Sequence, residues 1–238
     1  MGRQEESVVR VELLSYTGDP EAVVVAAIRQ CYSSIGAREL KKKTDKETQR
    51  RLLAQIMASG HTSTLEHASF TFVIEGISRT AEIHLVRHRI ASYSIQSGRY
   101  VKRGKTKYTI PPEIIKNKIV LKKYKNYLKK CQEFYNELLE LGFKAEDARM
   151  VQPQSVQIKA VVTMNARALR HFFELRCCQR AQWEIREMAN KMLLEVKKVA
   201  PIIFEKAGAS CLSQKICWEG DLSCGLYKSL RGRLGKRG

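Results

Sequence analysis

The 238 residues, of which 44% are hydrophobic and 28% are charged, have the composition of an ordinary folded protein and exclude a wholly disordered chain. No apolar run is long enough to span a bilayer, and the first ten residues lack the apolar segment of a secretory signal, so we expect one globular unit in the cytoplasm. The chain has 43 Lys and Arg against 24 Asp and Glu, which gives a net charge of +19. This charge favours phosphate-bearing partners but does not distinguish between nucleotides, cofactors and RNA.

The first half of the chain alternates between strand and helix patterns. A strand is predicted over residues 8–17, followed by a helix that Asp19 caps. A second helix is predicted over 44–60, and the alternating, aromatic segment 67–78 indicates another strand. Helical composition resumes over 79–90 and passes into a loop that contains serine and glycine.

The second half is dominated by long helices. Apolar residues that recur at spacings of three and four predict one amphipathic helix over 114–141, with its lysines on the outer face. A strand over 155–164 leads to a helix that Asn165 caps, and a last helix is predicted over 181–208, bent before Pro201. Together these elements predict an α+β fold with a largely antiparallel sheet.

Basic residues concentrate in two places. Between Val101 and Lys130 eleven Lys and Arg accompany a single acid, and the last twelve residues contain five basic residues and no acid. Such runs are more often a solvated face than a polyanion site, and a basic amphipathic helix packs on a protein core more often than on a membrane or RNA.

The seven cysteines are an odd number in a chain without an export signal, so we expect no structural disulfides. Cys211, Cys217 and Cys224 lie close together in the sequence, but their gaps of five and six residues fit none of the common C-x-x-C zinc patterns. The sequence therefore predicts no metal site.

One stretch, "RHRIASYSIQSGRY" at residues 87–100, combines cations, serines and tyrosines without an acid. The chain contains no G-x-G-x-x-G after a strand and no G-x-x-x-x-G-K-[ST], so side chains and exposed amides must hold any phosphate. Arginine binds phosphate through two parallel contacts, and Ser97 with the amides around Gly98 can close a small pocket. The alternative is a set of solvated arginines at a helix end, and composition alone does not decide.

The order of residues in this stretch resembles the signature of the flavin-dependent thymidylate synthases. Arg87, His88 and Arg89 are followed, after seven residues, by Ser97 and then by Arg99. Three further motifs extend the resemblance to about residue 208: "GHTSTLEHASFTF", "AEDARMVQP", and "MNARALRHFFELR" with the following "AQWEIR".

The resemblance implies a homotetrameric enzyme, with sites at subunit interfaces, that methylates deoxyuridine monophosphate (dUMP) at carbon 5 to give thymidylate (dTMP). Methylenetetrahydrofolate would supply the carbon, bound FAD would carry hydride, and NADPH would be the reductant. The catalytic domain would cover residues 1–208, followed by a basic, cysteine-containing tail over 209–238.

The resemblance also assigns the site residues. The FAD site would comprise His61, Ser63, Arg87, His88, Arg89, Ile95, Asn165, Ala166, Arg167 and His171. The dUMP site would comprise His84, Leu85, Val86, Arg87, Gln96, Ser97, Gly98, Arg99, Arg149 and Arg176. Arg176 would also be catalytic, because a permanent cation beside the uracil ring favours the N3-deprotonated form, whose carbon 5 is the better nucleophile.

Three positions depart from the family pattern. Ile83 stands where a polar or basic residue is usual, His84 where a glutamine is usual, and Ile95 where Glu or Gln is usual. We expect Ile83 to pack against its neighbours, His84 to replace the glutamine as a donor, and Ile95 to offer only backbone or van der Waals contact.

Two hypotheses follow from these residues. In a continuous helix Arg176 lies about half a turn out of phase with Arg167 and His171, so we expect the three to serve two pockets of an oligomer. The alternative function is a basic RNA- or polyanion-binding protein on a degenerate flavoenzyme scaffold. Since no common RNA-binding motif is present, we expect only nonspecific binding of nucleic acid by the tail.

Overall fold

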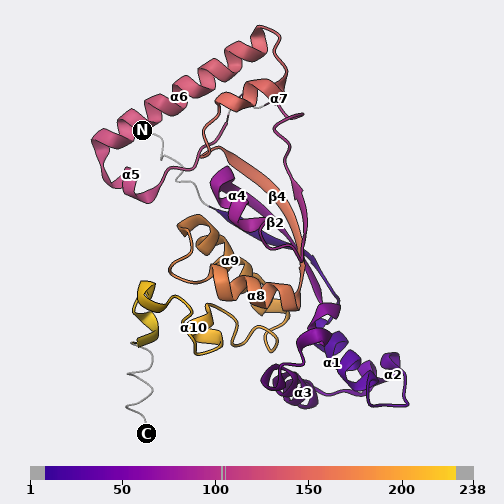
Figure 1. Ribbon diagram of the computed structural model, residues 1–238. Coiled ribbons are helices and arrows are strands. Elements are labelled where there is room, and N and C mark those ends of the chain that lie inside the picture. The colour runs from indigo at the N-terminus through magenta and orange to yellow at the C-terminus, as the bar shows by residue number, and fades with distance from the viewer. Residues whose placement is uncertain (1–8, 103, 105, 229–238) are drawn as a thin grey trace. The chain divides into compact units, whose positions relative to one another are not determined.

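The structure is a computed structural model that describes residues 9–102, 104 and 106–228 (Figure 1). The sequence predicted one globular unit, whereas the chain divides into two compact units. Among the described residues, unit 1 contains Val9 and Arg10, Ile74–Arg87 and Tyr93–Val161, and unit 2 contains Val11–Val73, His88–Ser92 and residues 162–228.

Four strands form a single antiparallel sheet, which confirms the α+β class. The strands are β1 (Arg10–Tyr16), β2 (Ser69–Ser78), β3 (Ser92–Ile95) and β4 (Gln157–Asn165), in the order β1-β2-β4-β3. Strands β1, β2 and β4 confirm the three predicted from alternation. The prediction of a loop around β3 is wrong, because four residues that include two serines are too short a segment to show a strand pattern.

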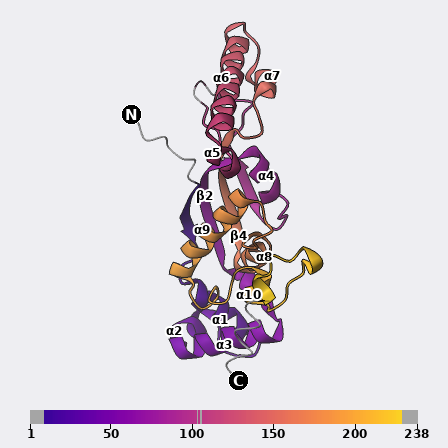
Figure 2. The ribbon, with the colours of Figure 1, turned by 90° about the vertical axis from the view of Figure 1, so that its left-hand side faces the viewer.

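Unit 2 contains most of the short helices. These are α1 (Pro20–Gln30), α2 (Ala37–Lys43), α3 (Lys46–Ser59), the 3-10 turn η1 (Thr62–His67), α8 (Ala166–Arg176), α9 (Trp183–Val199), α10 (Ser210–Ser213) and η3 (Gly220–Leu222). Helix α1 packs on both α2 and α3, and α8 packs beside α9 (Figures 1 and 2).

Unit 1 contains the longest helix. Its elements are α4 (Arg79–Leu85), α5 (Pro112–Lys116), α6 (Lys118–Glu140), α7 (Ala145–Ala148) and η2 (Arg149–Val151). The predicted helix over 79–90 ends early, and the predicted single helix over 114–141 is two helices. The break occurs because the side chain of Asn117 accepts hydrogen bonds from the N–H groups of Ile119 and Val120, both at 3.1 Å, and so begins a new helix.

Helix caps fix the start of α1 and of α8, the helix that carries most of the candidate residues of unit 2. The side chain of Asp19 accepts a hydrogen bond from the N–H of Ala22 (3.3 Å), and that of Asn165 accepts one from Ala168 (2.8 Å), as the sequence predicted. Helix α3 ends at Gly60, whose φ of 77° lies in the left-handed region that glycine adopts without strain. The chain reverses there and continues directly into η1.

The core of unit 2 contains a cluster of aromatic side chains that are fully buried. The Phe204 ring lies 5.5 Å from that of Phe70 and 5.9 Å from that of Phe173, in edge-to-face contacts. Phe173 in turn contacts Phe172 at 5.8 Å. Such pairs contribute about 1 kcal/mol each beyond the burial of their area, so this cluster holds β2, α8 and the chain after α9 together.

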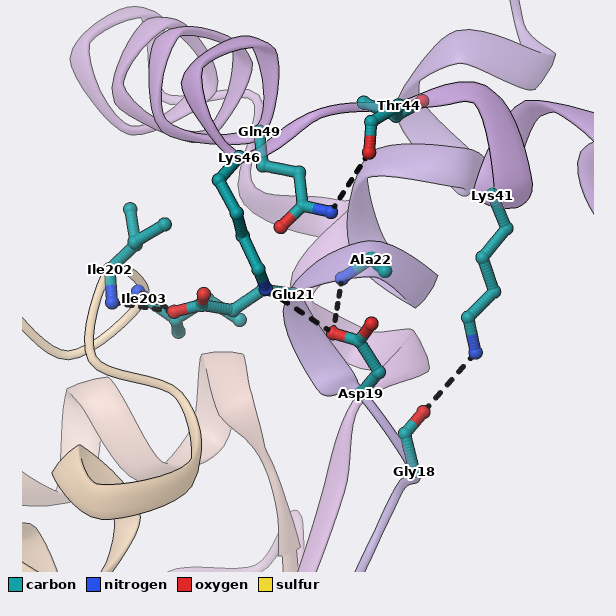
Figure 3. A network of polar contacts seen from close by, with 10 residues as sticks. All are labelled: Gly18, Asp19, Glu21, Ala22, Lys41, Thr44, Lys46, Gln49, Ile202 and Ile203. Atoms are coloured by element: carbon teal, nitrogen blue, oxygen red, sulfur yellow. Dashed lines mark hydrogen bonds and ion pairs between the residues drawn. The ribbon is translucent and has the colours of Figure 1, made fainter.

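The last helix is shorter than predicted, because α9 ends at Val199 and not near residue 208. Pro201 follows with no N–H to continue the helical bonds. Figure 3 shows how the next two amides are satisfied: the buried carboxylate of Glu21, on α1, accepts hydrogen bonds from Ile202 (2.5 Å) and Ile203 (3.3 Å). One acid thus joins the first helix of unit 2 to the end of α9.

None of the helices in the described ranges is long and apolar enough to cross a membrane. The basic tail that the sequence analysis noted lies outside the described residues from position 229 onward. The boundary between a catalytic domain and a tail near residue 208 therefore stays a prediction, although residues 209–228 belong to unit 2.

Candidate functional site

The first group of candidate residues lies in unit 2, where η1 packs against α8. The turn at Gly60 leaves His61 and Ser63 exposed at the start of η1. Glu66, on the same turn, accepts a hydrogen bond from Arg167 of α8 at 2.6 Å. Both side chains of this pair are about half exposed, so it aligns the two elements more than it stabilises the fold.

His88 is the centre of the second group in unit 2. Its Nε2 accepts a hydrogen bond from Nε of Arg176 at 2.9 Å, and its ring lies edge-to-face on Phe172 at 4.8 Å and 6.1 Å from the ring of His171. Because an arginine nitrogen only donates, Nε2 of His88 carries no proton and the neutral ring has its hydrogen on Nδ1. His88 therefore orients Arg176 without adding a second positive charge.

The surroundings of His88 keep it neutral. Burial, then the Arg176 cation, then His171 lower the pKa of His88 from 6.5 to about 4. Because the folded pKa lies below the unfolded one, the stability that depends on neutral His88 is fully present above pH 6.5 and is lost as the pH falls toward 4.

We expect the ring of His88, observed by NMR, to titrate with a midpoint near pH 4. In an Arg176→Gln variant the midpoint should rise, because the neighbouring cation is gone, but stay below 6.5, because burial is the largest cause. Arg180→Gln, which removes an arginine paired with Glu219, is the matched control and should leave the midpoint unchanged. A wild-type midpoint near 6.5 would contradict the burial of this ring.

Helix α8 is continuous from Ala166 to Arg176. That its three candidate residues serve two pockets of an oligomer stays a prediction, but helical phase does not keep two of them apart. Arg176 and His171 both approach the ring of His88 in a single chain. A difference of five residues along α8 therefore does not keep these two side chains apart. Arg167, which pairs with Glu66, lies in a separate contact.

Unit 1 contains the turn that follows β3. The N–H of Gln96 donates to the carbonyl of Lys159 at 2.9 Å, which holds the chain beside β4. The hydroxyl of Ser97 accepts from the N–H of Arg99 at 3.2 Å, and its carbonyl accepts from Val101 at 3.1 Å. These contacts hold the backbone on either side of Gly98, and the anion pocket expected there stays a prediction.

Two candidate arginines of unit 1, fifty residues apart in sequence, meet at Glu146. Nε of Arg99 lies 2.7 Å from a carboxylate oxygen of Glu146, and Nε of Arg149 donates to the backbone carbonyl of Glu146 at 3.1 Å. The Arg99 and Arg149 side chains are exposed, so an incoming phosphate can replace the carboxylate as the partner of Arg99.

Arg87 and Arg89 differ from these paired arginines. Both are exposed, and none of the acidic side chains described in the structure forms an ion pair with either of them. Arg87 belongs to unit 1 and Arg89 to unit 2. An unpaired, exposed guanidinium in each unit is suited to a phosphate ligand.

Burial limits what some candidate residues contribute. The side chains of Leu85 and Ala166 are fully buried, so a ligand can contact only their backbone. The Leu85 carbonyl already accepts from the hydroxyl of Tyr93 (3.0 Å), and the Ala166 N–H donates to Ala68 (2.8 Å). The side chain of Asn165 is engaged as the cap of α8.

The departures from the family pattern lie at different depths. His84 and Ile95 are half-buried, whereas Val86, an assigned dUMP residue that fits the pattern, is 39% exposed. The expectation that Ile83 packs against its neighbours is wrong, because its side chain is 50% exposed. Within one chain Ile83 therefore presents an apolar surface to solvent.

The two assigned residue sets divide between the units. All FAD residues lie in unit 2 except Arg87 and Ile95, and all dUMP residues lie in unit 1 except Arg176. The FAD set of unit 2 offers exposed arginine and serine donors together with the neutral ring of His88. These donors fit the chemistry of a pyrophosphate.

Sequence reasoning missed a cavity in unit 2 of about 310 Å³ that five cysteines line: Cys177, Cys178, Cys211, Cys217 and Cys224. The sequence showed that Cys211, Cys217 and Cys224 lie close together along the chain. The spacing of Cys177 and Cys178, at the end of α8, gave no indication that they join the other three. Burial raises the pKa of Cys177 to about 12, so this thiol is protonated at neutral pH. All seven cysteines are free, and no group of His, Cys, Asp or Glu within the described part of the chain is arranged to hold a metal ion.

Comparison with known proteins gives a consistent result. Residues 12–202 match the family described as "Thymidylate synthase complementing protein". The chain is 49% identical to a flavin-dependent thymidylate synthase of Geobacter sulfurreducens, over 91% of this chain and 94% of the relative, and 46% identical to one of Clostridium tetani, over 91% and 93%. The structure of a UMP/dUMP methylase, PolB of Streptomyces cacaoi, bound with 5-Br dUMP, is similar with a TM-score of 0.74 at 27% identity, covering 84% of this chain and 94% of that one.

Proposed function

The chain belongs to the flavin-dependent thymidylate synthase family, and from this premise we propose that it converts dUMP to dTMP. Methylenetetrahydrofolate supplies the carbon, FAD is the flavin cofactor, and NADPH is the reductant. The observation that carries the proposal is the match to a relative of this activity over 91% of the chain at 49% identity.

The residues of unit 2 fit the flavin that the family requires. The exposed Arg89 and Ser63 would donate to its pyrophosphate, and His61 lies at the start of the same η1 turn as Ser63. When bound, FAD supplies the hydride carrier that the side chains lack. The protein contributes position and electrostatics.

Arg176 would act on the uracil ring. Its hydrogen bond to His88 holds the guanidinium in place, and because His88 is neutral the local positive charge belongs to Arg176. A fixed cation favours the ionised ring, which increases electron density at carbon 5. His88 is thus a positioning residue for Arg176 as well as a candidate flavin ligand.

The turn after β3 would bind the phosphate of dUMP in unit 1. Ser97 and the amides near Gly98 would supply short-range donors, and Arg99 and Arg149, which both contact Glu146, would supply charge. On binding, Arg99 would exchange the carboxylate of Glu146 for the phosphate of dUMP.

We also propose that the protein is a homotetramer with its sites at subunit junctions, as the family resemblance implies. Large apolar side chains beside the assigned residues support this assembly, because they are exposed in one chain: Ile90 is 73% exposed, Tyr100 76% and Met150 79%. Surfaces of this kind are usually covered by a ligand or by another subunit.

The test is a flavin spectrum followed by an assay. Purified protein is mixed with FAD, freed of excess, and titrated with dUMP; we expect a retained visible flavin band that shifts when dUMP binds. With methylenetetrahydrofolate and NADPH added, dTMP should form, and omitting NADPH should stop its formation. A protein that retains no flavin and forms no dTMP would contradict the proposal and would favour the polyanion-binding alternative, which salt-dependent RNA binding would then test.

A further inference from the structure

We propose that the exposed face of α6 pairs with the same helix of a second copy, antiparallel and about a two-fold axis. The inference concerns the assembly proposed above and does not depend on the catalytic reaction. It rests on three features of α6: a row of exposed apolar residues, an opposite charge on each half of the helix, and a cysteine at its midpoint.

Apolar residues occupy two rows along α6. One row faces its own chain: Leu128 and Tyr135 are only 6% and 1% exposed. The residue before each of these, about 100° around the helix, is Tyr127 or Phe134, and these are 51% and 48% exposed. The helix therefore buries one apolar row within unit 1 and leaves a second row uncovered.

The uncovered row has the period of a coiled coil. It consists of Val120, Tyr127, Phe134 and Leu141, which recur every seven residues and are 43%, 51%, 48% and 67% exposed. Half-buried Tyr124, Cys131 and Leu138 lie between them, so that the spacing alternates between four and three residues. Three sustained heptads of this kind are the pattern by which two helices pack side by side.

The charges of α6 select an antiparallel copy as the occupant. Residues 118–130 contain six lysines and no acid, whereas residues 131–140 contain three glutamates and no base. A parallel pair would place lysines against lysines. An antiparallel pair places Lys123 near Glu137 of the partner subunit, because both flank the apolar row on the same side.

The same charge pattern disfavours other occupants. An anionic membrane or RNA would attract the lysine half but repel the glutamates of the other half, and the exposed row runs along both. A second copy satisfies both halves with one surface, which is the self-complementary arrangement of a two-fold interface.

Cross-linking tests the pairing and its direction. Cys131 lies at the middle of the row, so it should lie close to Cys131 of the partner subunit, within reach of a bismaleimide that spans about 10 Å, the separation of packed helices. We expect the wild-type protein to give this linked peptide, identified by mass spectrometry. Cys131→Ser should remove it, and Cys31→Ser, at an exposed cysteine of unit 2, should not.

The ends of the row distinguish the two directions. In a Cys131→Ser background, combined Val120→Cys and Leu141→Cys should give a link between positions 120 and 141, while Val120→Cys alone should give none, because the two copies of residue 120 would lie about 30 Å apart. A link between two copies of position 120 would overturn the antiparallel arrangement.

Association measurements complete the test. Phe134→Glu should reduce the mass in solution by splitting this interface, whereas Phe134→Leu and Ile119→Glu, the latter at an exposed apolar residue off the row, should leave it unchanged. Lys123→Glu should raise the dissociation constant about tenfold, and adding Glu137→Lys should restore it. An active, oligomeric protein without any cross-link between α6 helices would overturn the pairing. A monomer that binds anionic vesicles through α6 would overturn it too. Neither result would contradict the proposed synthesis of dTMP.

Discussion

Replacing Arg176 with alanine is expected to lower the rate of dTMP formation about a hundred- to a thousand-fold while the protein still retains FAD. The expected loss is large because Arg176 is the cation proposed to stabilise the ionised uracil ring. It is half-buried and fixed through its Nε to His88, so solvent screens its charge less than that of a surface arginine. The rate is measured with saturating dUMP, and flavin retention is measured from the visible band after removal of excess FAD.

Three variants separate this role from general damage. Arg176→Lys keeps the charge but not the planar guanidinium that contacts His88 and the ring together, so we expect an intermediate rate. Arg180→Ala, which removes an arginine of unit 2 paired with Glu219, should be close to wild type. Arg87→Ala should weaken both FAD and dUMP binding, because the resemblance assigns it to both. Equal loss of flavin in Arg176→Ala and Arg87→Ala would contradict the division of roles.

Local chemistry made much of the fold predictable. The alternation of buried and exposed residues in β2 and the caps at Asp19 and Asn165 are signals carried within a few residues, and all three are confirmed. The break at Asn117 was missed because apolar spacing continues across it, although asparagine is itself a strong cap. The end of α9 was placed too late because the acceptor that lets the chain leave the helix after Pro201 is not local: Glu21 lies 181 residues from Ile202, whose N–H it accepts.

The candidate site was predictable as a list but not as an arrangement. Motif order assigned Arg99 and Arg149 to one ligand, yet nothing in the sequence shows that they meet at Glu146. The contact between His88 and Arg176 joins residues 88 apart and depends on tertiary packing. Helical phase did not predict that Arg176 and His171 both approach His88, because phase places backbone positions, whereas a long side chain and a ring from another segment decide the contact.

Replacing Glu21 with alanine is expected to destabilise unit 2 by about 3 kcal/mol, the largest effect on stability that we predict. Its carboxylate is 4% exposed and accepts the N–H groups of Ile202 and Ile203, which no helical carbonyl can reach after Pro201. Alanine leaves two donors buried without an acceptor. Both tryptophans, Trp183 and Trp218, belong to unit 2, so their fluorescence during urea unfolding measures this change.

The consequence extends to the site, because the two amides hold the chain next to Phe204, whose ring packs on Phe173. Phe172, beside Phe173, supports the ring of His88. Glu21→Gln keeps an acceptor oxygen on a side chain of the same shape. It should lower the free energy of unfolding by only about 1 kcal/mol, because the two hydrogen bonds are kept but their acceptor is neutral. Glu39→Ala, which removes an exposed acid of α2, should change stability by less than about 0.5 kcal/mol. If Glu21→Ala were as stable as the glutamine variant, water would have to satisfy both amides, and the connection from α1 to the support of His88 would not hold.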